Sequence, residues 1–552
     1  MNAERERSRS LWMEEDFPIG TPLREDAGAT ILVVGAGIAG LATAYELALA
    51  GHYVLVIDRG QLAGGMSART SAHLSCISDD YFHVLIDRHG EEHARDFLES
   101  QRAAIDRIET IVRDEQIACD FARLDGFTFA VDDDGKRALE REKGACDKLG
   151  FPGVEWVDAP LGGEGRGCLR FPAQARFHPL KFMSGLCSAI VRRGGRLCPH
   201  TPIREIAERD GRVIAKSAGG HEIVAEAAVV ATNTPIIDRV AVHTKQAPYR
   251  TYVVAMEAPR GSVPDALIWD TADPYHYVRL QPQADGDVVL IGGEDHKTGT
   301  ADDGAERIRR LEAWARGRIP EIGRTVAAWS GQIYEPADHA PYIGLNPGSE
   351  RVFIVTGDSG QGLTTGAVAG IMLPALIAGD AQPWAAFYDP SRKPLAAGSL
   401  SEYAKENLTM PANLAQHVTP GEADADEIAP DAGAIIRRGL HKHAAYRDGR
   451  GALHELSASC THMGCVVQWN GFEGCWDCPC HGSHFSPWGD VLQGPATTAL
   501  EPAKASRKRR TSERNRGSAT AAMTAPRTNC GRSRKVSNLV TGGQLVEGER
   551  MS

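Results

Sequence analysis

A glycine-rich turn between an apolar strand and a helix is the feature that most restricts how this chain can fold. Residues 31–34 (ILVV) form a short apolar run typical of a buried strand, and residues 35–40 (GAGIAG) follow directly. Residues 41–50 are rich in Ala and Leu and predict a helix, and residues 53–57 predict a second strand. A strand, a G-x-G-x-x-G turn and a helix are together typical of a dinucleotide-binding unit.

Each residue type in this unit has a physical task. Gly35 allows the tight turn, Gly37 lets the backbone approach a pyrophosphate, and Gly40 lets helix and strand pack closely. The helix N-terminus offers unpaired N–H groups to phosphates. Asp58, which ends the second strand 18 positions after Gly40, is expected to accept hydrogen bonds from ribose hydroxyls. Its carboxylate disfavours the 2′-phosphate of NADP and leaves FAD or NAD.

Three further segments favour FAD over NAD. Residues 64–71 (GGMSARTS) place small and hydroxyl side chains after the second strand, and residues 229–233 (VVATN) predict another buried strand. Residues 356–365 (TGDSGQGLTT) open a long apolar helix whose N-terminal dipole would stabilise an anionic reduced flavin. The predicted cofactor contacts in these segments are Ser67, Arg69, Thr70, Gly357, Gly360, Gly362, Leu363 and Thr364.

Together these motifs resemble the D-amino-acid oxidase, glycine oxidase and sarcosine oxidase family of FAD enzymes over residues 28–395. Residues 174–181 (QARFHPLK) and 338–344 (DHAPYIG) also fit that family, whereas Asp58 stands where Glu is commoner. The resemblance implies hydride transfer from a substrate amine or a related C–H donor to the flavin. It also implies that Arg and Tyr hold a substrate carboxylate. Tyr277 and Arg279, which share one strand face, are the candidate catalytic contacts, and Asp295 and His296 are weaker candidates.

A second motif near the C-terminus combines cysteine with histidine. Cys460 and His462 form a C-x-H pair, and after fifteen residues Cys478 and His481 form a C-x-x-H pair. Two Cys and two His suit either zinc or a [2Fe–2S] centre with mixed ligands. Zinc sites rarely place Cys and His together in both halves, which favours the iron–sulfur interpretation.

This pattern resembles the Rieske domain. The resemblance implies that Cys460 and Cys478 bind one iron and that His462 and His481 bind the other. It also implies a Cys465–Cys480 disulfide between the two loops and a third loop at residues 494–496. Ser483 is placed to donate a hydrogen bond to sulfur, whereas Phe485 stands where respiratory Rieske proteins carry Tyr, so we expect a lower reduction potential than theirs. Cys475 has no assigned role.

The predicted fold class is mixed α/β. A Rossmann-like FAD-binding domain (about 28–90, 175–245 and 330–395) interleaves with an antiparallel-sheet substrate domain (about 91–174 and 246–329). A small all-β Rieske domain follows at 431–503. The remaining parts are an N-terminal extension (1–27), a Pro-rich acidic linker (396–430) and a basic tail (504–552) that we expect to be disordered.

Charge and hydropathy exclude several classes. The net charge is −11, yet residues 504–535 alone carry +10, so the rest of the chain carries −21, which argues against nucleic acid as a partner of the main body. No run approaches the roughly 20 apolar residues of a membrane span. The N-terminus lacks the apolar core of a secretory signal, and we therefore expect a cytoplasmic protein.

The combined resemblance is to bacterial FAD-dependent oxidoreductases fused to a C-terminal Rieske domain. It predicts an enzyme that oxidises a small molecule, with an amine or an amino acid as candidates. Electrons would pass singly between flavin and cluster, and an external protein or quinone would accept or supply them. Two alternatives remain open: a pure electron-transfer protein, and a plain oxidase whose Rieske domain senses redox state.

Overall fold

The structure is a computed structural model that describes residues 5–18, 20–161, 166–237, 242–393 and 396–503. Residues Met1–Ala505 group into one compact unit. The predicted basic tail lies outside the described residues. Within the described ranges, no helix combines the length and apolar character needed to cross a lipid bilayer.

The glycine-rich turn belongs to an eight-stranded sheet in the order β16-β17-β10-β1-β2-β7, with β9 beside β10 and β8 beside β9. From β17 to β7 the neighbouring strands run parallel. Every residue of β2 is buried, as expected of a parallel strand covered on both faces. The strands are β1 (Ala27–Val34), β2 (Val54–Ile57), β7 (Arg196–Cys198), β8 (Ile203–Arg209), β9 (Arg212–Ser217), β10 (Glu222–Val230), β16 (Tyr342–Leu345) and β17 (Val352–Thr356).

A nine-stranded, largely antiparallel sheet forms the second layer, in the order β15-β11-β14-β13-β12-β4-β6-β3, with β5 beside β6. Its long central strands come from the segment predicted for the substrate domain. The strands are β3 (His73–Leu74), β4 (Ala122–Phe129), β5 (Glu155–Val157), β6 (Cys168–Arg176), β11 (Gln246–Ala258), β12 (Leu267–Asp270), β13 (His276–Gln283), β14 (Gly286–Lys297) and β15 (Thr325–Pro336).

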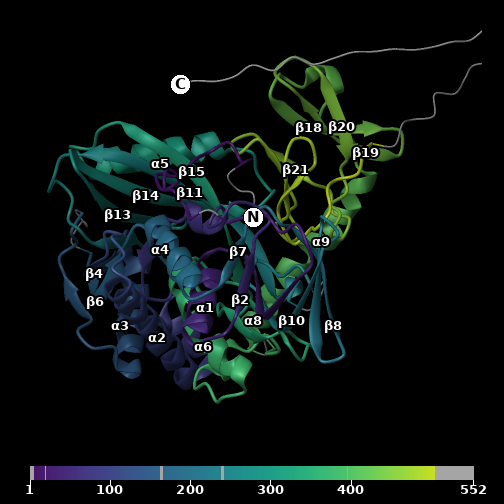
Figure 1. Ribbon diagram of the computed structural model, residues 1–552. Helices are drawn as coiled ribbons and strands as arrows, with labels where there is room; N and C mark the ends of the chain where they lie inside the picture. Colours follow the sequence, from purple (N-terminus) through teal and green to yellow (C-terminus); the bar gives the residue numbers. More distant parts are fainter. Residues whose placement is uncertain (1–4, 19, 162–165, 238–241, 394–395, 504–552) are drawn as a thin grey trace, which may run out of the picture. The chain divides into compact units, whose positions relative to one another are not determined.

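Small residues let two helices pack closely beside the parallel sheet. A Cβ on Gly366 would come within 2.9 Å of the Ala39 backbone, and one on Gly370 within 3.1 Å of Ala42, so α6 lies directly against α1. Figure 1 shows α1, α2 and α6 grouped together. The helices are α1 (Ile38–Leu49), α2 (Phe82–Asp114), α3 (Asp133–Leu149), α4 (Pro179–Arg192), α5 (Gly304–Arg318), α6 (Gly362–Ala378), α7 (Ala385–Tyr388), α8 (Ala397–Asn407) and α9 (Thr409–Ala415).

The C-terminal segment is all β. Its two antiparallel sheets are β18-β19-β20 and β21-β22-β23-β24. They enclose an apolar core that includes Trp469, Trp476 and Phe485. The strands are β18 (Ala432–Arg438), β19 (His441–Arg447), β20 (Leu453–Ser457), β21 (Gln468–Asn470), β22 (Cys475–Asp477), β23 (His484–Phe485) and β24 (Val491–Gln493).

The segment predicted to be a linker, residues 396–430, contains the two helices α8 and α9. The Asn413 side chain accepts a hydrogen bond from the Val466 backbone N–H and donates one to the Val466 carbonyl. Asn407 donates to the carbonyl of Thr244. Through these hydrogen bonds the segment contacts both the flavoprotein-like region and the C-terminal domain.

The N-terminal extension contributes to a buried row of charges. Arg69 pairs with Glu6 and Glu473, and His484 joins Glu6 at 2.7 Å. Arg250, beside His484, pairs with Asp477 at 2.9 Å. We call Glu473, Arg69, Glu6, His484, Arg250 and Asp477 the junction network; their side chains are at most 2% exposed. It joins the extension, the flavoprotein-like sheets and the C-terminal domain.

Replacing Glu6 by Gln should destabilise the protein by about 3 kcal/mol, because removing one member of a buried ion-pair group leaves its partners uncompensated. Arg5→Gln is the matched control, since Arg5 pairs with Asp490 while both are about half exposed, and such pairs contribute at most about 1 kcal/mol. Chemical unfolding of both variants measures the difference. Equal losses would contradict a special role for the network.

The Glu6 contribution should also depend on pH. Burial alone would raise the pKa of Glu6, but Arg69 and His484 lower the pKa from its ordinary 4.5 to about 2. A carboxylate with a lowered folded-state pKa stabilises the fold above about pH 4.5 and loses that effect as the pH falls toward 2. The stability difference between wild type and Glu6→Gln should therefore shrink from about pH 5 to about pH 3, which unfolding curves at several pH values would show.

Candidate functional site

A cavity opens where the parallel strands end. Its walls include the turn after β1, the residue after β2, the end of β17 and the first turn of α6. All predicted cofactor contacts but Gly40 line this cavity. They are Gly35, Gly37, Asp58, Ser67, Arg69, Thr70, Gly357, Gly360, Gly362, Leu363 and Thr364.

The glycines are required by close contacts at the turn. Gly35 has a φ of +107°, and a Cβ there would lie 2.2 Å from the Ala231 carbonyl oxygen. A Cβ on Gly40 would lie 1.9 Å from the Gly35 carbonyl oxygen, so Gly40 serves helix packing and not the cavity wall. A Cβ on Gly37 would come within 3.1 Å of Ser67 Oγ, inside the space that a phosphate group needs. The turn therefore fits a bound dinucleotide.

Asp58 accepts a hydrogen bond from the backbone of the same turn. One carboxylate oxygen accepts the Ala36 backbone N–H at 2.7 Å, and the other accepts that of Gly60 at 2.9 Å. Its position in the cavity wall also allows the predicted ribose contact. The neighbouring Ser67 hydroxyl accepts the Ile38 N–H at the start of α1.

Arg69 lines the cavity, but its guanidinium is engaged elsewhere. It donates to the Ser330 carbonyl, the Ser8 carbonyl and the Glu473 carboxylate, and its own carbonyl accepts the Trp329 indole N–H. The side chain therefore connects the cavity wall to the junction network. Sequence reasoning identified Arg69 but not this connection, because its partners are distant in the chain.

The structure separates the two predicted catalytic residues. Tyr277 lines the cavity, and Gly292 leaves room for its ring, since a Cβ there would lie 2.1 Å from it. Arg279 is fully buried outside the cavity wall and donates to the carbonyls of Ala72 and Phe177. Burial lowers the pKa of Arg279 to about 9. Arg279 therefore differs from Tyr277 in that its guanidinium is occupied by backbone carbonyls outside the wall.

One part of the cavity wall, beside the predicted cofactor contact Gly360, is acidic and aromatic. Asp79 and Asp295 line it together with Trp269, Tyr275 and Tyr277. The Tyr275 hydroxyl donates to Asp79 at 3.0 Å. Loss of hydration inside the cavity, with the charge of Asp80 adding, raises the pKa of Asp79 to about 8, and burial raises that of Asp295 to about 6. His296, the other weak candidate, lies outside the wall and stacks on Tyr252.

Sequence reasoning missed Asp79 and Trp269 in this part of the wall. Asp79 lies in a short loop after β3 and Trp269 lies in β12, so no local pattern connects them. Only the pairing of distant strands in the nine-stranded sheet brings them together.

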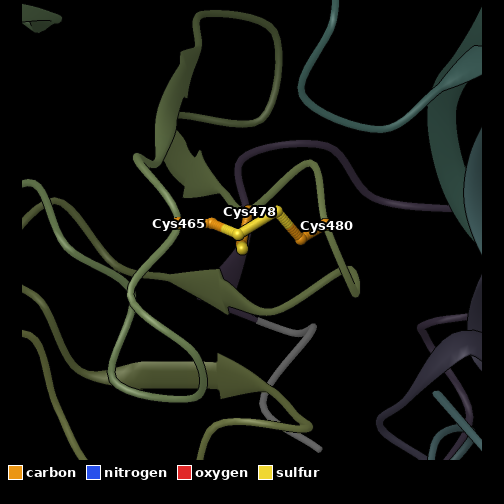
Figure 2. A group of neighbouring side chains, drawn as sticks. All are labelled: Cys465, Cys478 and Cys480. Atoms are coloured by element: carbon orange, nitrogen blue, oxygen red, sulfur yellow. A yellow bond between two sulfur atoms is a disulfide. The ribbon is translucent and has the colours of Figure 1, made fainter. Parts of the chain in front are cut away.

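The second candidate site lies in the C-terminal domain. Cys460 and Cys478 have their thiols within hydrogen-bonding reach, and the rings of His462 and His481 lie 5.0 Å apart. The predicted ligands thus gather at one place. The Cys465–Cys480 disulfide is present with an S–S distance of 2.04 Å. Figure 2 shows the Cys478 sulfur beside that disulfide, which occupies two of these three sulfurs and so leaves no three-thiol metal site here.

The residues fit a [2Fe–2S] cluster. The buried Nδ1 of His481 has no hydrogen-bond partner in the described part of the chain, as expected of a nitrogen reserved for a metal. Burial, with His462 and His243 adding, lowers the pKa of His481 to about 3, so the imidazole is in the neutral form that binds metal. The Ser483 side chain forms a hydrogen bond with Cys460. Phe485 is fully buried and offers no hydroxyl.

The two candidate sites lie close to each other. Gly494, in the third loop of the C-terminal domain, is part of the wall of the large cavity. His243, from the flavoprotein-like region, packs its ring 5.0 Å from that of His462 and 5.8 Å from that of His481. Gln332, another wall residue, donates to the Gly482 carbonyl at 2.9 Å. Gly482 must lack a side chain, because a Cβ would lie 2.6 Å from Gln332.

Two family models match the chain. The model described as FAD dependent oxidoreductase covers residues 30–376, and the model described as Rieske [2Fe-2S] domain covers residues 422–504. The first family binds FAD and the second domain binds a [2Fe–2S] cluster, so both cofactor predictions are confirmed.

Individual relatives agree with this organisation. "Putative Rieske 2Fe-2S iron-sulfur protein YhfW" of Bacillus subtilis is 29% identical over 506 residues, covering 90% of this chain and 98% of that protein. Gamma-glutamylputrescine oxidoreductase of Escherichia coli is 25% identical over 68% of this chain and 90% of its own length. Glycine oxidase from Geobacillus kaustophilus matches in structure with a TM-score of 0.57 at 19% identity, over 66% of this chain and 99% of that one. The last match shows the fold alone.

Replacing Cys478 by Ser should abolish the cluster, whereas Cys475→Ser should retain it. Both cysteines are buried, but Cys475 lies beside Asp477 and the junction network, whereas Cys478 lies beside Cys460. Iron analysis and the EPR spectrum of the reduced proteins measure the outcome. Loss of iron in Cys475→Ser with an intact fold would reassign the ligands.

Ser483→Ala should lower the reduction potential of the cluster by on the order of 50 mV, because a hydrogen bond to sulfur stabilises the more negative reduced state. Ser486→Ala is the matched control, since this buried hydroxyl accepts the Asp490 N–H instead. An EPR-monitored redox titration measures both. An unchanged potential in Ser483→Ala would mean that this hydroxyl does not act on the cluster.

Proposed function

Because the chain belongs to the FAD dependent oxidoreductase family and carries a Rieske domain, we propose that it oxidises a small molecule and exchanges electrons singly between flavin and cluster. Bound FAD would supply two-electron chemistry, and the [2Fe–2S] centre would supply one-electron chemistry. Oxidation of an amine removes two electrons and two protons, one from C–H and one from N–H, and leaves a C=N bond. The two electrons would then reach an external acceptor one at a time.

The position of His243 is the observation that carries this proposal. The ring edges of the two predicted histidine ligands meet a side chain of the flavoprotein region, and His481 is only 6% exposed. Gly494 brings the third Rieske loop to the wall of the cavity predicted for FAD. This proximity supports electron exchange within one chain.

The chain's own residues would prepare the site for this reaction. The turn at Gly35 and Gly37 and the start of α1 would hold the pyrophosphate, and Asp58 would hold the ribose. The first turn of α6, with Gly362 and Leu363 in the wall, would face the ring end of the cofactor. Tyr277 would contact the substrate, since it lines the cavity and bonds through its hydroxyl to Thr251 at 3.0 Å.

The two alternatives have less support. A pure electron-transfer protein would not need the enclosed acidic and aromatic part of the cavity. A redox-sensing Rieske domain would present its histidines to a separate partner, whereas His481 faces His243. We propose a protein or a quinone as the external electron partner.

We also place the protein in the cytoplasm. Six cysteines outside the C-terminal domain are buried thiols, which fits a reducing compartment. They are Cys76, Cys119, Cys146, Cys168, Cys187 and Cys198.

Photoreduction of the flavin under anaerobic conditions should be followed by the EPR signal of the reduced cluster, at a rate independent of protein concentration, because the transfer is intramolecular. The experiment needs no organic substrate. Cys478→Ser, which should lack the cluster, is the control in which the flavin stays reduced. A rate that rises in proportion to protein concentration would refute transfer within one chain.

A further inference from the structure

The two carboxylates in the acidic and aromatic part of the cavity, Asp79 and Asp295, have no cationic side chain beside them in the described wall. Arg307, which pairs with Glu294, and His276 act on Asp295 from outside the wall. Asp79 and Asp295 form no ion pair with any Lys or Arg in the described part of the chain. Asp80, the adjacent residue, differs, because it pairs with His339 at 3.0 Å and accepts a hydrogen bond from Ser359. Among the described residues of the cavity wall, only Arg59 and Arg69 carry a cationic side chain. Arg59 adjoins Asp58, the predicted ribose contact, and Arg69 is committed to Glu6 and Glu473.

The same part of the cavity is lined by aromatic rings. The rings of Tyr275 and Tyr277 lie 5.8 Å apart, and the His73 ring lies 5.5 Å from Tyr277 and 5.4 Å from Trp269. Burial lowers the pKa of His73 to about 3, so this imidazole is neutral and does not supply a positive charge. Electron-rich ring faces attract organic cations. These rings therefore favour the same ligand charge as the carboxylates, by an independent interaction.

One carboxylate oxygen is available to a ligand. Asp295 Oδ1 is buried and has no hydrogen-bond partner among the described residues. Asp79 is exposed to the cavity, and its one side-chain donor is the Tyr275 hydroxyl. A buried acceptor without a donor is costly, and an ammonium group offers several donors together with the missing charge.

We propose that the substrate is an organic amine cation without a carboxylate beside the reacting carbon, held between Asp79 and Asp295 inside the rings of Trp269, Tyr275 and Tyr277. A substrate carboxylate would meet two carboxylates and no cation there, since Arg279 is outside the wall. This inference rests on the proposed function for the reaction, but it concerns binding only. It selects amines over amino acids, the two candidates that the sequence left open.

The raised pKa values of Asp79 and Asp295 agree with this arrangement. Burial is the main cause for both. Asp80, Asp295 and Asp358 raise the pKa of Asp79 further, and Tyr275 lowers it. Glu294 raises the pKa of Asp295 further, whereas Thr251, Arg307 and His276 lower it. A bound cation would lower both pKa values. Binding should therefore be tested at about pH 8.5, where both carboxylates are more fully ionised.

The test uses tetramethylammonium, a cation that keeps its charge at every pH and has no N–H to oxidise. Titrated into the FAD- and cluster-containing protein, it should perturb the flavin absorbance spectrum, whereas the neutral isostere tert-butanol and the anion acetate should not. Asp295→Asn should weaken the binding about tenfold, because it removes one of the two negative charges that attract the cation, and Asp79→Asn should act in the same direction. Asp285→Asn, an exposed residue between β13 and β14, is the matched control and should leave the binding unchanged.

Comparing Tyr275→Phe with Tyr275→Ala distinguishes the contribution of the Tyr275 ring to cation binding from that of its hydroxyl. These variants test the inference even if an aspartate variant fails to fold. Phe should retain most of the cation binding, and Ala should lose it. Acetate binding that matches or exceeds that of tetramethylammonium, or binding unaffected by Asp295→Asn in a folded protein, would overturn the inference. The photoreduction experiment needs no substrate, so its failure would overturn the proposed electron exchange and leave the cation site standing.

Discussion

The junction network is the interaction on which the arrangement of the two cofactor sites depends. Its charges come from the N-terminal extension, from the segment that follows β2, from β11 and from the C-terminal domain. Because Arg69 pairs with Glu6 and Glu473, and Arg250 pairs with Asp477, across segments, separating the segments would leave buried charges without their partners. Arg69 also lines the cavity, so the network ties the Rieske domain to the flavin site itself.

That attachment determines which face of the iron–sulfur site meets the flavin region. Gln332 and Tyr334 of β15 donate to backbone carbonyls at Gly482 and His481, and Gly482 has no side chain to obstruct them. His243 then packs against the imidazoles of both predicted histidine ligands. The geometry favours a protein in which the cluster serves the flavin of its own chain.

The sequence predicted the cofactor elements well because their chemistry is local. The turn at 35–40 brings its glycines, its helix and its strand together within a few residues, and the Cys and His pairs lie on two short loops. The Cys465–Cys480 disulfide follows from the same resemblance and is present. The acidic and aromatic part of the cavity depends on contacts that are not local. Tyr277 and Arg279 share a strand, but Arg279 turns out to be buried behind the wall, where backbone carbonyls accept its donors.

The sequence by itself therefore determined the two cofactor classes and the order of the two matched domains, and it predicted which residues hold phosphate and iron, since each depends on spacing within a short segment. Only the tertiary structure decided which acidic and aromatic side chains share the cavity, and which side of the C-terminal domain lies against the cavity. Asp79, Trp269, Tyr275 and Asp295 come from a loop and from separate strands, and the junction network spans more than 400 residues, from Glu6 to His484. Such groups meet only when distant strands pair, and no local pattern records which of them will share a cavity.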